Sequence, residues 1–206
     1  MTIQKYSLGQ LQANCYFLIE DNQCLIIDPA DEADFILEKI QRENLELIGL
    51  IATHGHFDHV MAAGEIQLSF PVPLYLHPDD TFLIKRLAST AKHFLGYEPA
   101  VVEPNKIMPI KKGPWKIRPF NIETILTPGH TPGSCCFYIK GENTVFTGDT
   151  LFRAGIGRYD FAYSDKDKLF ESIAKLYQLP EETIIYSGHG EETTIDEEKN
   201  PLRDAI

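Results

Sequence analysis

Apolar and polar positions alternate along the first half of the chain in a pattern that predicts short strands and one helix. After a first apolar run, YSLGQ, the runs NCYFLIE and CLIIDPA predict two strands, and LIGLIATHGH predicts a further strand that ends on histidines. Between CLIIDPA and LIGLIATHGH, residues 31–43 carry apolar side chains at helical spacing, which predicts a helix, and Asp31 is its expected N-cap. The expected core-facing positions of this helix are Phe35, Ile36, Ile40 and, in part, Leu37.

The second half of the chain repeats this style. Its predicted strands are KIRPFNIETILTPG, CCFYIKGENTVFTGD and ETIIYSGHG. The second of these is a hairpin that turns at Gly141, Glu142 and Asn143, and a helix is expected over about Ser164–Leu179. Two such halves predict an α/β fold in which two sheets pack face to face with helices outside.

Length and composition favour one domain over residues 1–206. The chain is 43% apolar, which is enough to close one substantial core. The N-terminus carries no basic region followed by a long apolar stretch, and no run approaches the ~20 apolar residues that span a bilayer. We therefore expect a cytoplasmic protein.

The charge balance excludes some classes of partner. Lys and Arg number 19 against 30 Asp and Glu, which gives a formal charge of −11. A surface of that sign argues against nucleic acid or an anionic membrane as the partner. The acidic charge indicates nothing further about the substrate, because metal ions can neutralise several of these carboxylates; the small-molecule partner expected below comes from a family resemblance.

The four cysteines do not form a metal or redox motif. Cys15, Cys24, Cys135 and Cys136 include no CxxC pair, and the last two are neighbours on a predicted strand, where they point to opposite faces. We interpret them as small apolar core residues in a reducing compartment.

A cluster of metal-ligand residue types follows the apolar run LIGLIA. The segment THGHFDH places three imidazoles and a carboxylate, at His54, His56, Asp58 and His59, on the loop that leaves a buried strand. His130 in LTPGH, Asp149 in VFTGD and His189 in IIYSGH also follow apolar strands, and each comes directly after a glycine. Imidazole and carboxylate donors suit Zn²⁺ and similar ions, and a catalytic site keeps one position open for water. The sequence therefore predicts a metal site.

This pattern resembles the metallo-β-lactamase superfamily, whose signature is an HxHxDH loop followed by separate His, Asp and His ligands. The resemblance implies a four-layer αββα sandwich with two mixed sheets, and a site with two metal ions. By that resemblance His54, His56 and His130 hold the first ion, Asp58, His59 and His189 hold the second, and Asp149 bridges them. The expected ions are Zn²⁺, with Fe or Mn²⁺ as alternatives, because the same ligands accept all three.

The implied chemistry is hydrolysis. Two ions about 3.5 to 4 Å apart share a hydroxide and aim it at a carbonyl while one of them stabilises the oxyanion. Asp58 serves in this scheme both as a ligand and as the acceptor of the nucleophile's proton.

The motifs THGHFDH, PGHTPGS, GDTLFRAGIGRYDF and SGHGEETTIDEEKNPLR are similar to the glyoxalase II branch, over essentially the whole chain. That branch hydrolyses S-(2-hydroxyacyl)glutathione thioesters such as S-lactoylglutathione, in methylglyoxal detoxification. Arg158 matches a basic residue that contacts glutathione there, so Arg158 and Tyr159 are the candidate substrate contacts. The alternative for Arg158 is a loop cap that donates to carbonyls. The chain is similar to the short bacterial form, which lacks a C-terminal helical extension, so other acyl thioesters are also candidate substrates.

Other activities remain as alternatives. The persulfide dioxygenase group resembles glyoxalase II in most motifs but uses one iron at positions matching His54, His130 and Asp149. The TLF after Asp149 and the GHG around His189 favour the hydrolase, as does the complete second ligand set. A non-enzymatic structural metal site would be a closed, Cys-rich tetrahedral set, which seven such donors do not resemble. A β-lactamase and a nuclease are disfavoured by the lack of an export signal and by the acidic charge.

Two histidines stay without an assigned role. His77 in LYLHPDD and His93 in AKHFLGY are interpreted as strand-end or loop residues rather than ligands. The sequence does not determine the oligomeric state.

Overall fold

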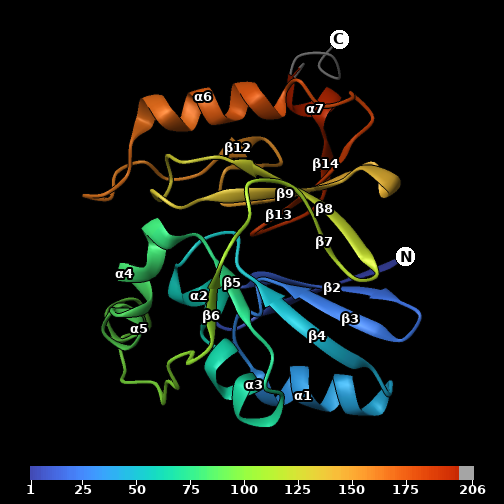
Figure 1. The fold of residues 1–206 in the computed structure, drawn as a ribbon. Coiled ribbons are helices and arrows are strands. Elements are labelled where there is room, and N and C mark those ends of the chain that lie inside the picture. Colours follow the sequence, from blue (N-terminus) through green and yellow to red (C-terminus); the bar gives the residue numbers. More distant parts are fainter. Residues whose placement is uncertain (200–206) are drawn as a thin grey trace. The chain divides into compact units, whose positions relative to one another are not determined.

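The computed structural model describes residues 1–199, so the end of the last glyoxalase-like motif, from Asn200 on, lies outside the described residues. The chain divides into two compact units, residues 1–110 and the residues from 111 on. Each unit contains one six-stranded sheet (Figure 1). The expectation of a single domain stays a prediction.

The first unit is built on a mixed sheet with the strand order β1-β2-β3-β4-β5-β6. Strands β1 to β3 are antiparallel, whereas β3 to β6 run parallel, and helices connect the first parallel strands. The strands are β1 (Thr2–Leu8), β2 (Ala13–Glu20), β3 (Gln23–Ile27), β4 (Glu46–Ile51), β5 (Leu74–Leu76) and β6 (Ile107–Pro109). The helices are α1 (Ala33–Arg42), α2 (Phe57–Val60), α3 (Ala63–Ser69), α4 (Thr81–Ile84) and α5 (Leu87–Leu95), with a 3-10 turn at Pro78–Asp80.

The second unit is built on a mixed sheet with the order β14-β13-β10-β9-β8-β7. Only β10 and β13 pair in parallel among these strands. The strands are β7 (Gly113–Ile117), β8 (Phe120–Leu126), β9 (Cys135–Ile139), β10 (Thr144–Gly148), β13 (Ile184–Ser187) and β14 (Thr193–Thr194). A small hairpin pairs β11 (Leu151–Phe152) with β12 (Gly155–Ile156), and the helices are α6 (Lys166–Leu176) and α7 (Ile195–Lys199).

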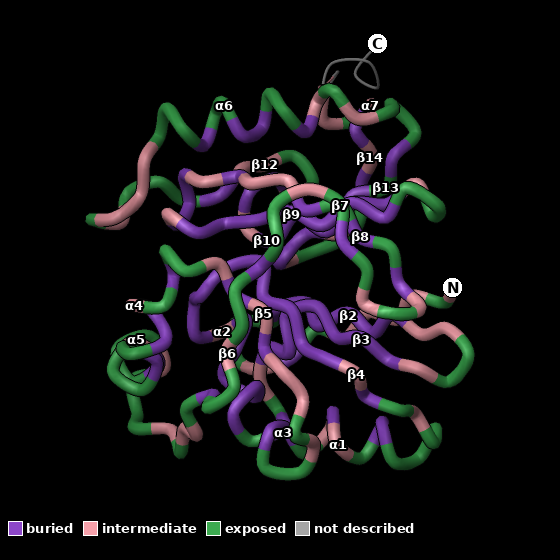
Figure 2. The backbone as a smooth tube through the Cα atoms, in the orientation of Figure 1, coloured by how far each residue is buried: buried purple, intermediate pink, exposed green. Residues whose placement is uncertain are grey.

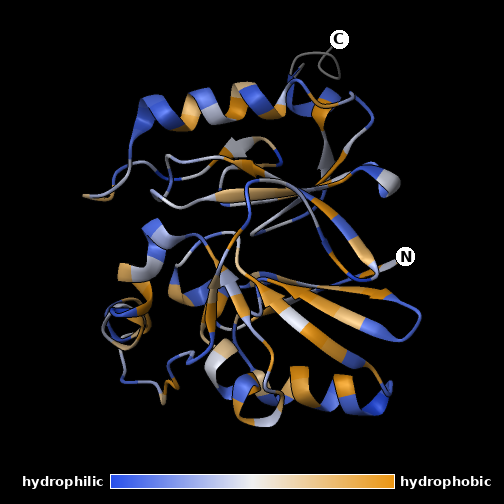
Figure 3. Cartoon of the chain, viewed as in Figure 1, coloured by the Kyte–Doolittle hydropathy of each residue, from blue (hydrophilic) through white to orange (hydrophobic). Residues whose placement is uncertain are grey.

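The apolar runs found in the sequence form the cores of both units. Strand β2 is buried over its first six residues, and Ile36 and Ile40 of α1 pack into the same cluster (Figure 2). In the second unit, α6 presents Leu169, Ile173 and Leu176 to the sheet and polar residues to solvent (Figure 3). The amphipathic spacing of each helix thus decides which face is buried.

Most expected elements are confirmed, including the α/β class with two mixed sheets. The β9–β10 hairpin turns at a 3-10 segment, Lys140–Glu142, and at Asn143, whose φ is 48°. The expected N-cap Asp31 is wrong: α1 begins after Glu32, which is left-handed at φ 58°, and the Asp31 carboxylate accepts instead from the backbone N of Glu32.

All four cysteines are buried and free, and the neighbours Cys135 and Cys136 lie together on β9. Across residues 1–199, no helix is both long and apolar enough to cross a membrane.

Candidate metal centre

Four of the seven candidate ligands lie in the first unit, directly after β4. His54 and His56 are on the segment that leaves the strand, and both are buried. The sequence predicts Asp58 and His59 on the loop as well. In the structure they lie on the short helix α2. The chain turns into this helix after His56, whose extended backbone (φ −67°, ψ 145°) makes it the N-cap. Helical turning therefore sets the directions of the last two side chains.

A buried carboxylate that the sequence did not single out organises these ligands. Asp28 follows β3 and is only 1% exposed. Its Oδ1 accepts from the backbone N of Thr53 at 2.7 Å, and its Oδ2 accepts from Thr53 Oγ1 at 2.7 Å. The same Oδ2 lies 2.9 Å from Nδ1 of His59. One side chain thus fixes both ends of the ligand segment.

These bonds determine where the protons of two imidazoles lie. An ionised carboxylate only accepts hydrogen bonds, so Nδ1 of His59 carries the proton and Nε2 is left with its lone pair. The Thr53 hydroxyl has one proton, which it donates to Asp28. Nδ1 of His54, 3.0 Å from that hydroxyl, must therefore donate to it, and Nε2 of His54 also keeps its lone pair. Both tautomers present a metal-binding nitrogen.

The ring nitrogens of His54 and His56 approach each other closely. Nε2 of His54 lies 3.0 Å from Nδ1 of His56, and the ring centroids are 4.7 Å apart. Because Nε2 of His54 carries a lone pair, either a proton or a cation has to lie between these nitrogens. In the same unit, Oδ2 of Asp58 lies 3.7 Å from Nε2 of His59.

The segment between the first two histidines has no room for a side chain. The backbone N of Gly55 donates to Oδ2 of Asp80, which is fully buried, at 2.9 Å. A Cβ on Gly55 would lie 2.9 Å from the carbonyl oxygen of Asp80 and 3.0 Å from Cβ of Leu83. The glycine of the HxHxDH motif is therefore required by close packing.

The other three candidate ligands lie together in the second unit. The two carboxylate oxygens of Asp149 face different histidines: Oδ2 lies 3.5 Å from Nε2 of His130, and Oδ1 lies 3.8 Å from Nε2 of His189. Nδ1 of His130 donates to the carbonyl oxygen of Arg158 at 2.8 Å, so its Nε2 is again the nitrogen with the lone pair.

These separations suit ligands of a common ion. Donor atoms about 2.0 to 2.2 Å from a tetrahedral ion lie roughly 3.3 to 3.6 Å from one another. Oδ2 of Asp149 and Nε2 of His130 fall in this range, and Oδ1 of Asp149 and Nε2 of His189 lie slightly beyond it. The chemistry of the donor set, imidazole nitrogens and carboxylate oxygens, fits divalent metal ions, and the bonds described above fix the tautomers of His54, His59 and His130.

A glycine holds the loop beyond β12 against these ligands. A Cβ built on Gly157 would lie 1.8 Å from the carbonyl oxygen of Asp149 and 3.3 Å from Cβ of His130. The backbone of the loop therefore packs directly on the ligand segment.

The two candidate substrate contacts lie on the same loop and are exposed. Nε and Nη2 of Arg158 donate to the two carboxylate oxygens of Asp160, at 2.9 and 2.8 Å. The hydrogen bonds from Arg158 hold the pKa of Asp160 below its ordinary value. Tyr159 is 43% exposed, and Nζ of Lys166 lies 5.5 Å from the centre of its ring. Their role toward a substrate stays a proposal.

The two unassigned histidines have local contacts. Nδ1 of His77 accepts from the backbone N of Asp79 at 3.3 Å and caps the 3-10 turn that follows. His93 is exposed on α5 and packs edge-on against Phe94 at 5.2 Å.

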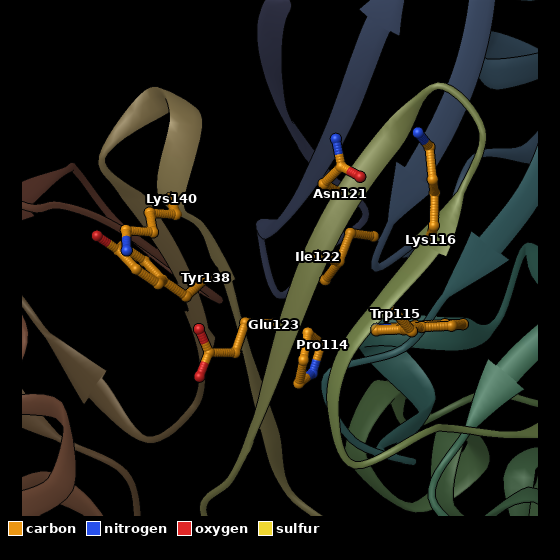
Figure 4. Close-up of a pocket in the computed structure, with 8 residues that line it drawn as sticks. All are labelled: Pro114, Trp115, Lys116, Asn121, Ile122, Glu123, Tyr138 and Lys140. Atoms are coloured by element: carbon orange, nitrogen blue, oxygen red, sulfur yellow. The ribbon is translucent and has the colours of Figure 1, made fainter.

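A surface cavity of about 400 Å³ lies elsewhere in the second unit, over strands β7, β8 and β9. Tyr138 and Lys140 line one side, and residues of the β7–β8 hairpin, among them Trp115 and Glu123, line the other (Figure 4). None of the candidate ligands lines it, so it is not the predicted site.

Comparisons with known proteins identify the family of the chain. Residues 8–189, which extend over both units, match the model of the metallo-beta-lactamase superfamily. The probable metallo-hydrolase YqgX of Bacillus subtilis is 37% identical, with 98% of this chain and 97% of the relative covered. The hydroxyacylglutathione hydrolase GloC of Haemophilus influenzae is also 37% identical, with 98% of each covered.

Two solved structures are similar over nearly their whole length. The BLEG-1 B3 metallo-beta-lactamase is 33% identical with a TM-score of 0.89, and the match covers 97% of each chain. TTHA1623, solved in a di-iron-bound form, is 35% identical with a TM-score of 0.87, over 95% of this chain and 96% of the other. These similarities confirm the fold class expected from the sequence.

Proposed function

Because the chain belongs to the metallo-β-lactamase superfamily, we propose that it is a metal-dependent hydrolase that cleaves a thioester, with S-(2-hydroxyacyl)glutathione as the first candidate substrate. The products are a 2-hydroxy acid and glutathione. Membership of the family supports metal-dependent hydrolysis. That the substrate is a thioester is our proposal.

The observation that carries the metal assignment is the division of Asp149 between two histidines. One oxygen faces His130 and the other faces His189. This is the arrangement needed for a carboxylate that bridges two ions. We assign His54, His56 and His130 to the first ion and Asp58, His59 and His189 to the second.

The donor types decide which ions we propose. Zn²⁺ is our first choice because all seven donors are imidazole nitrogens or carboxylate oxygens. The same donors accept Fe and Mn²⁺, and TTHA1623 was solved in a di-iron-bound form. We therefore propose two divalent ions, zinc first.

When bound, two such ions lower the pKa of a water molecule and polarise the substrate carbonyl. The chain supplies the remaining functions. We assign to the carboxylate of Asp58 the role of accepting the proton of the attacking water. In the overall reaction a C–O bond forms, the C–S bond breaks, and a proton from water ends on the departing thiolate.

The glutathione part of the proposal depends on the relative from Haemophilus influenzae and on Arg158. A guanidinium is the side chain that recognises a carboxylate with two parallel hydrogen bonds, and glutathione has two carboxylates. Tyr159, exposed beside it, offers an aromatic face and a hydroxyl.

One preparation of known metal content tests the assignment against its rivals. We would measure loss of the thioester of S-lactoylglutathione, oxygen uptake with glutathione persulfide, and hydrolysis of a chromogenic cephalosporin. Thioester loss without oxygen uptake supports the proposal. Iron-dependent oxygen uptake alone would assign the chain to the dioxygenase group, and cephalosporin hydrolysis alone would assign it to the β-lactamases.

A further inference from the structure

The guanidinium expected to bind substrate is already occupied by a carboxylate of the same loop. Arg158 donates from Nε and Nη2 to the two oxygens of Asp160, at 2.9 and 2.8 Å. Two parallel bonds of this kind are the geometry in which a guanidinium recognises a substrate carboxylate. Asp160 thus stands in the position of such a ligand.

This pair is held in place by an aromatic stack. The guanidinium carbon of Arg158 lies 4.4 Å from the centre of the Phe161 ring. Phe161 stacks on Tyr163 at 5.5 Å with 14° between the ring planes, and it meets the His130 ring edge-on at 5.8 Å. The carbonyl oxygen of Arg158 accepts from Nδ1 of His130. The pair is therefore fixed beside one of the candidate metal ligands.

We propose that Asp160 is a specificity-determining residue that competes with the carboxylate of a substrate for Arg158, and so weakens the preference for glutathione thioesters over thioesters of uncharged thiols. This inference depends on the proposed function. It also agrees with the short form that the chain resembles, in which other acyl thioesters are candidate substrates.

Two physical arguments support competition. Arg158 and Asp160 together carry no net charge, so the pair exerts little long-range attraction on an anionic substrate in a chain of formal charge −11. The Arg158 hydrogen bonds lower the pKa of Asp160 and so favour the ionised carboxylate, which is the form that competes. The side chains of Arg158 and Asp160 are 59% and 63% exposed.

The competition is graded because exposed ion pairs are weak. Displacing such a pair costs a substrate little, so removing Asp160 should change affinity by about two- to five-fold. The opposite role, in which Asp160 assists substrate binding, predicts an effect of opposite sign. If Asp160 positions Arg158 for substrate, its removal should weaken the binding of glutathione compounds, and the sign of the effect distinguishes the two roles.

Asp160→Asn is the variant to measure, since it keeps the shape of the side chain and removes the charge. Asp167→Asn is the matched control: Asp167 is exposed in the first turn of α6, and the substitution changes the net charge by the same amount. We would compare kcat/KM for the lactoyl thioesters of glutathione and of N-acetylcysteamine, an uncharged thiol.

The expected result for Asp160→Asn is a rise of about two- to five-fold in the ratio of kcat/KM for the glutathione ester to kcat/KM for the uncharged ester. This rise should come from a lower KM for the glutathione ester, and its size is the one expected from the loss of an exposed ion pair. The control should leave the ratio unchanged, and Arg158→Gln added to Asp160→Asn should abolish the rise. A lower or unchanged ratio in Asp160→Asn would overturn the proposal.

Calorimetric binding of S-methylglutathione, which is not a thioester, to the metal-loaded protein separates this inference from the proposed function. Tighter binding to Asp160→Asn than to the parent protein supports the competition even where no thioester is hydrolysed, which would count against the hydrolase alone. Equal or weaker binding overturns the competition even where both thioesters are cleaved.

Discussion

Replacing Asp28 by asparagine should disturb two candidate metal ligands at once, although Asp28 itself is not a candidate ligand. The substitution keeps the shape of the side chain but turns one acceptor oxygen into an NH₂ donor. If the amide oxygen keeps the bond to the backbone N of Thr53, the NH₂ group points toward Thr53 Oγ1 and Nδ1 of His59. Both atoms must then accept instead of donate.

The consequence is a reversal of tautomers. Nδ1 of His59 loses its proton to Nε2, the nitrogen that should bind metal. The Thr53 hydroxyl, which now accepts from the introduced amide, turns its proton toward Nδ1 of His54 and moves the proton of that ring to Nε2 as well. The opposite amide orientation is no better, because it places NH₂ against the buried backbone N–H of Thr53.

Magnitudes follow from the number of bonds changed. Mutating a residue that orients one ligand typically lowers metal affinity about 10- to 100-fold, and two ligands are affected here, so we expect a loss of at least about 100-fold. Three charge-assisted bonds become neutral ones, each weaker by about 1 kcal/mol, so the metal-free protein should lose about 2 to 3 kcal/mol of its free energy of unfolding.

Competition with a chromogenic chelator measures the first effect, and urea unfolding in excess chelator measures the second. Asp21→Asn, the same chemical change at an exposed turn residue, is the matched control. Metal affinity of Asp28→Asn within two-fold of that of the control would refute the tautomer argument. Unchanged stability of the metal-free protein would refute the hydrogen-bond count.

Two further predictions test packing and burial. Gly157→Ala should reduce bound metal and destabilise the protein by about 1 to 3 kcal/mol, because the new Cβ would lie 1.8 Å from the carbonyl oxygen of Asp149. Metal analysis and thermal unfolding check this against Gly155→Ala, where the added Cβ meets nothing closer than 3.9 Å, and equal behaviour of the two would contradict it. Burial raises the pKa of the Cys24 thiol to about 12, so this thiol stays protonated at pH 8. An aromatic disulfide reagent should therefore titrate no thiol in the native protein and four after unfolding, and fast reaction of the folded protein would count against the burial of the cysteines.

Several of the candidate ligands stand out in the sequence because they follow predicted strands. His54, Asp149 and His189 each follow an apolar run that became β4, β10 and β13, respectively. Local pattern is enough to identify such positions, since the residues that make the strand and the residues that follow it are neighbours in the chain. Local pattern gave the wrong N-cap for α1. Asp31 was expected there, but the N-cap is Glu32, which has a left-handed backbone, and the helix begins one residue later than expected.

Asp28 shows what local pattern does not contain. It also follows an apolar run, but its partners Thr53 and His59 are 25 and 31 residues further along the chain. Its position beside them depends on the parallel pairing of β3 with β4, which places the ends of both strands at one edge of the sheet. The sequence shows an acidic residue directly after CLII. It does not show which imidazole this carboxylate accepts from, because that depends on how the strands pair.

The acceptors that fix each tautomer belong to the same unit as the imidazole they orient. Asp28 and Thr53 act on His59 and His54 in the first unit, and the carbonyl oxygen of Arg158 acts on His130 in the second. Each of these three imidazoles is therefore oriented by groups of its own unit. It follows that replacing a ligand and replacing an acceptor have different consequences. Loss of Nε2 of His130 removes one candidate metal donor, whereas loss of the Asp28 carboxylate disturbs two candidate ligands and also removes three hydrogen bonds that stabilise its unit.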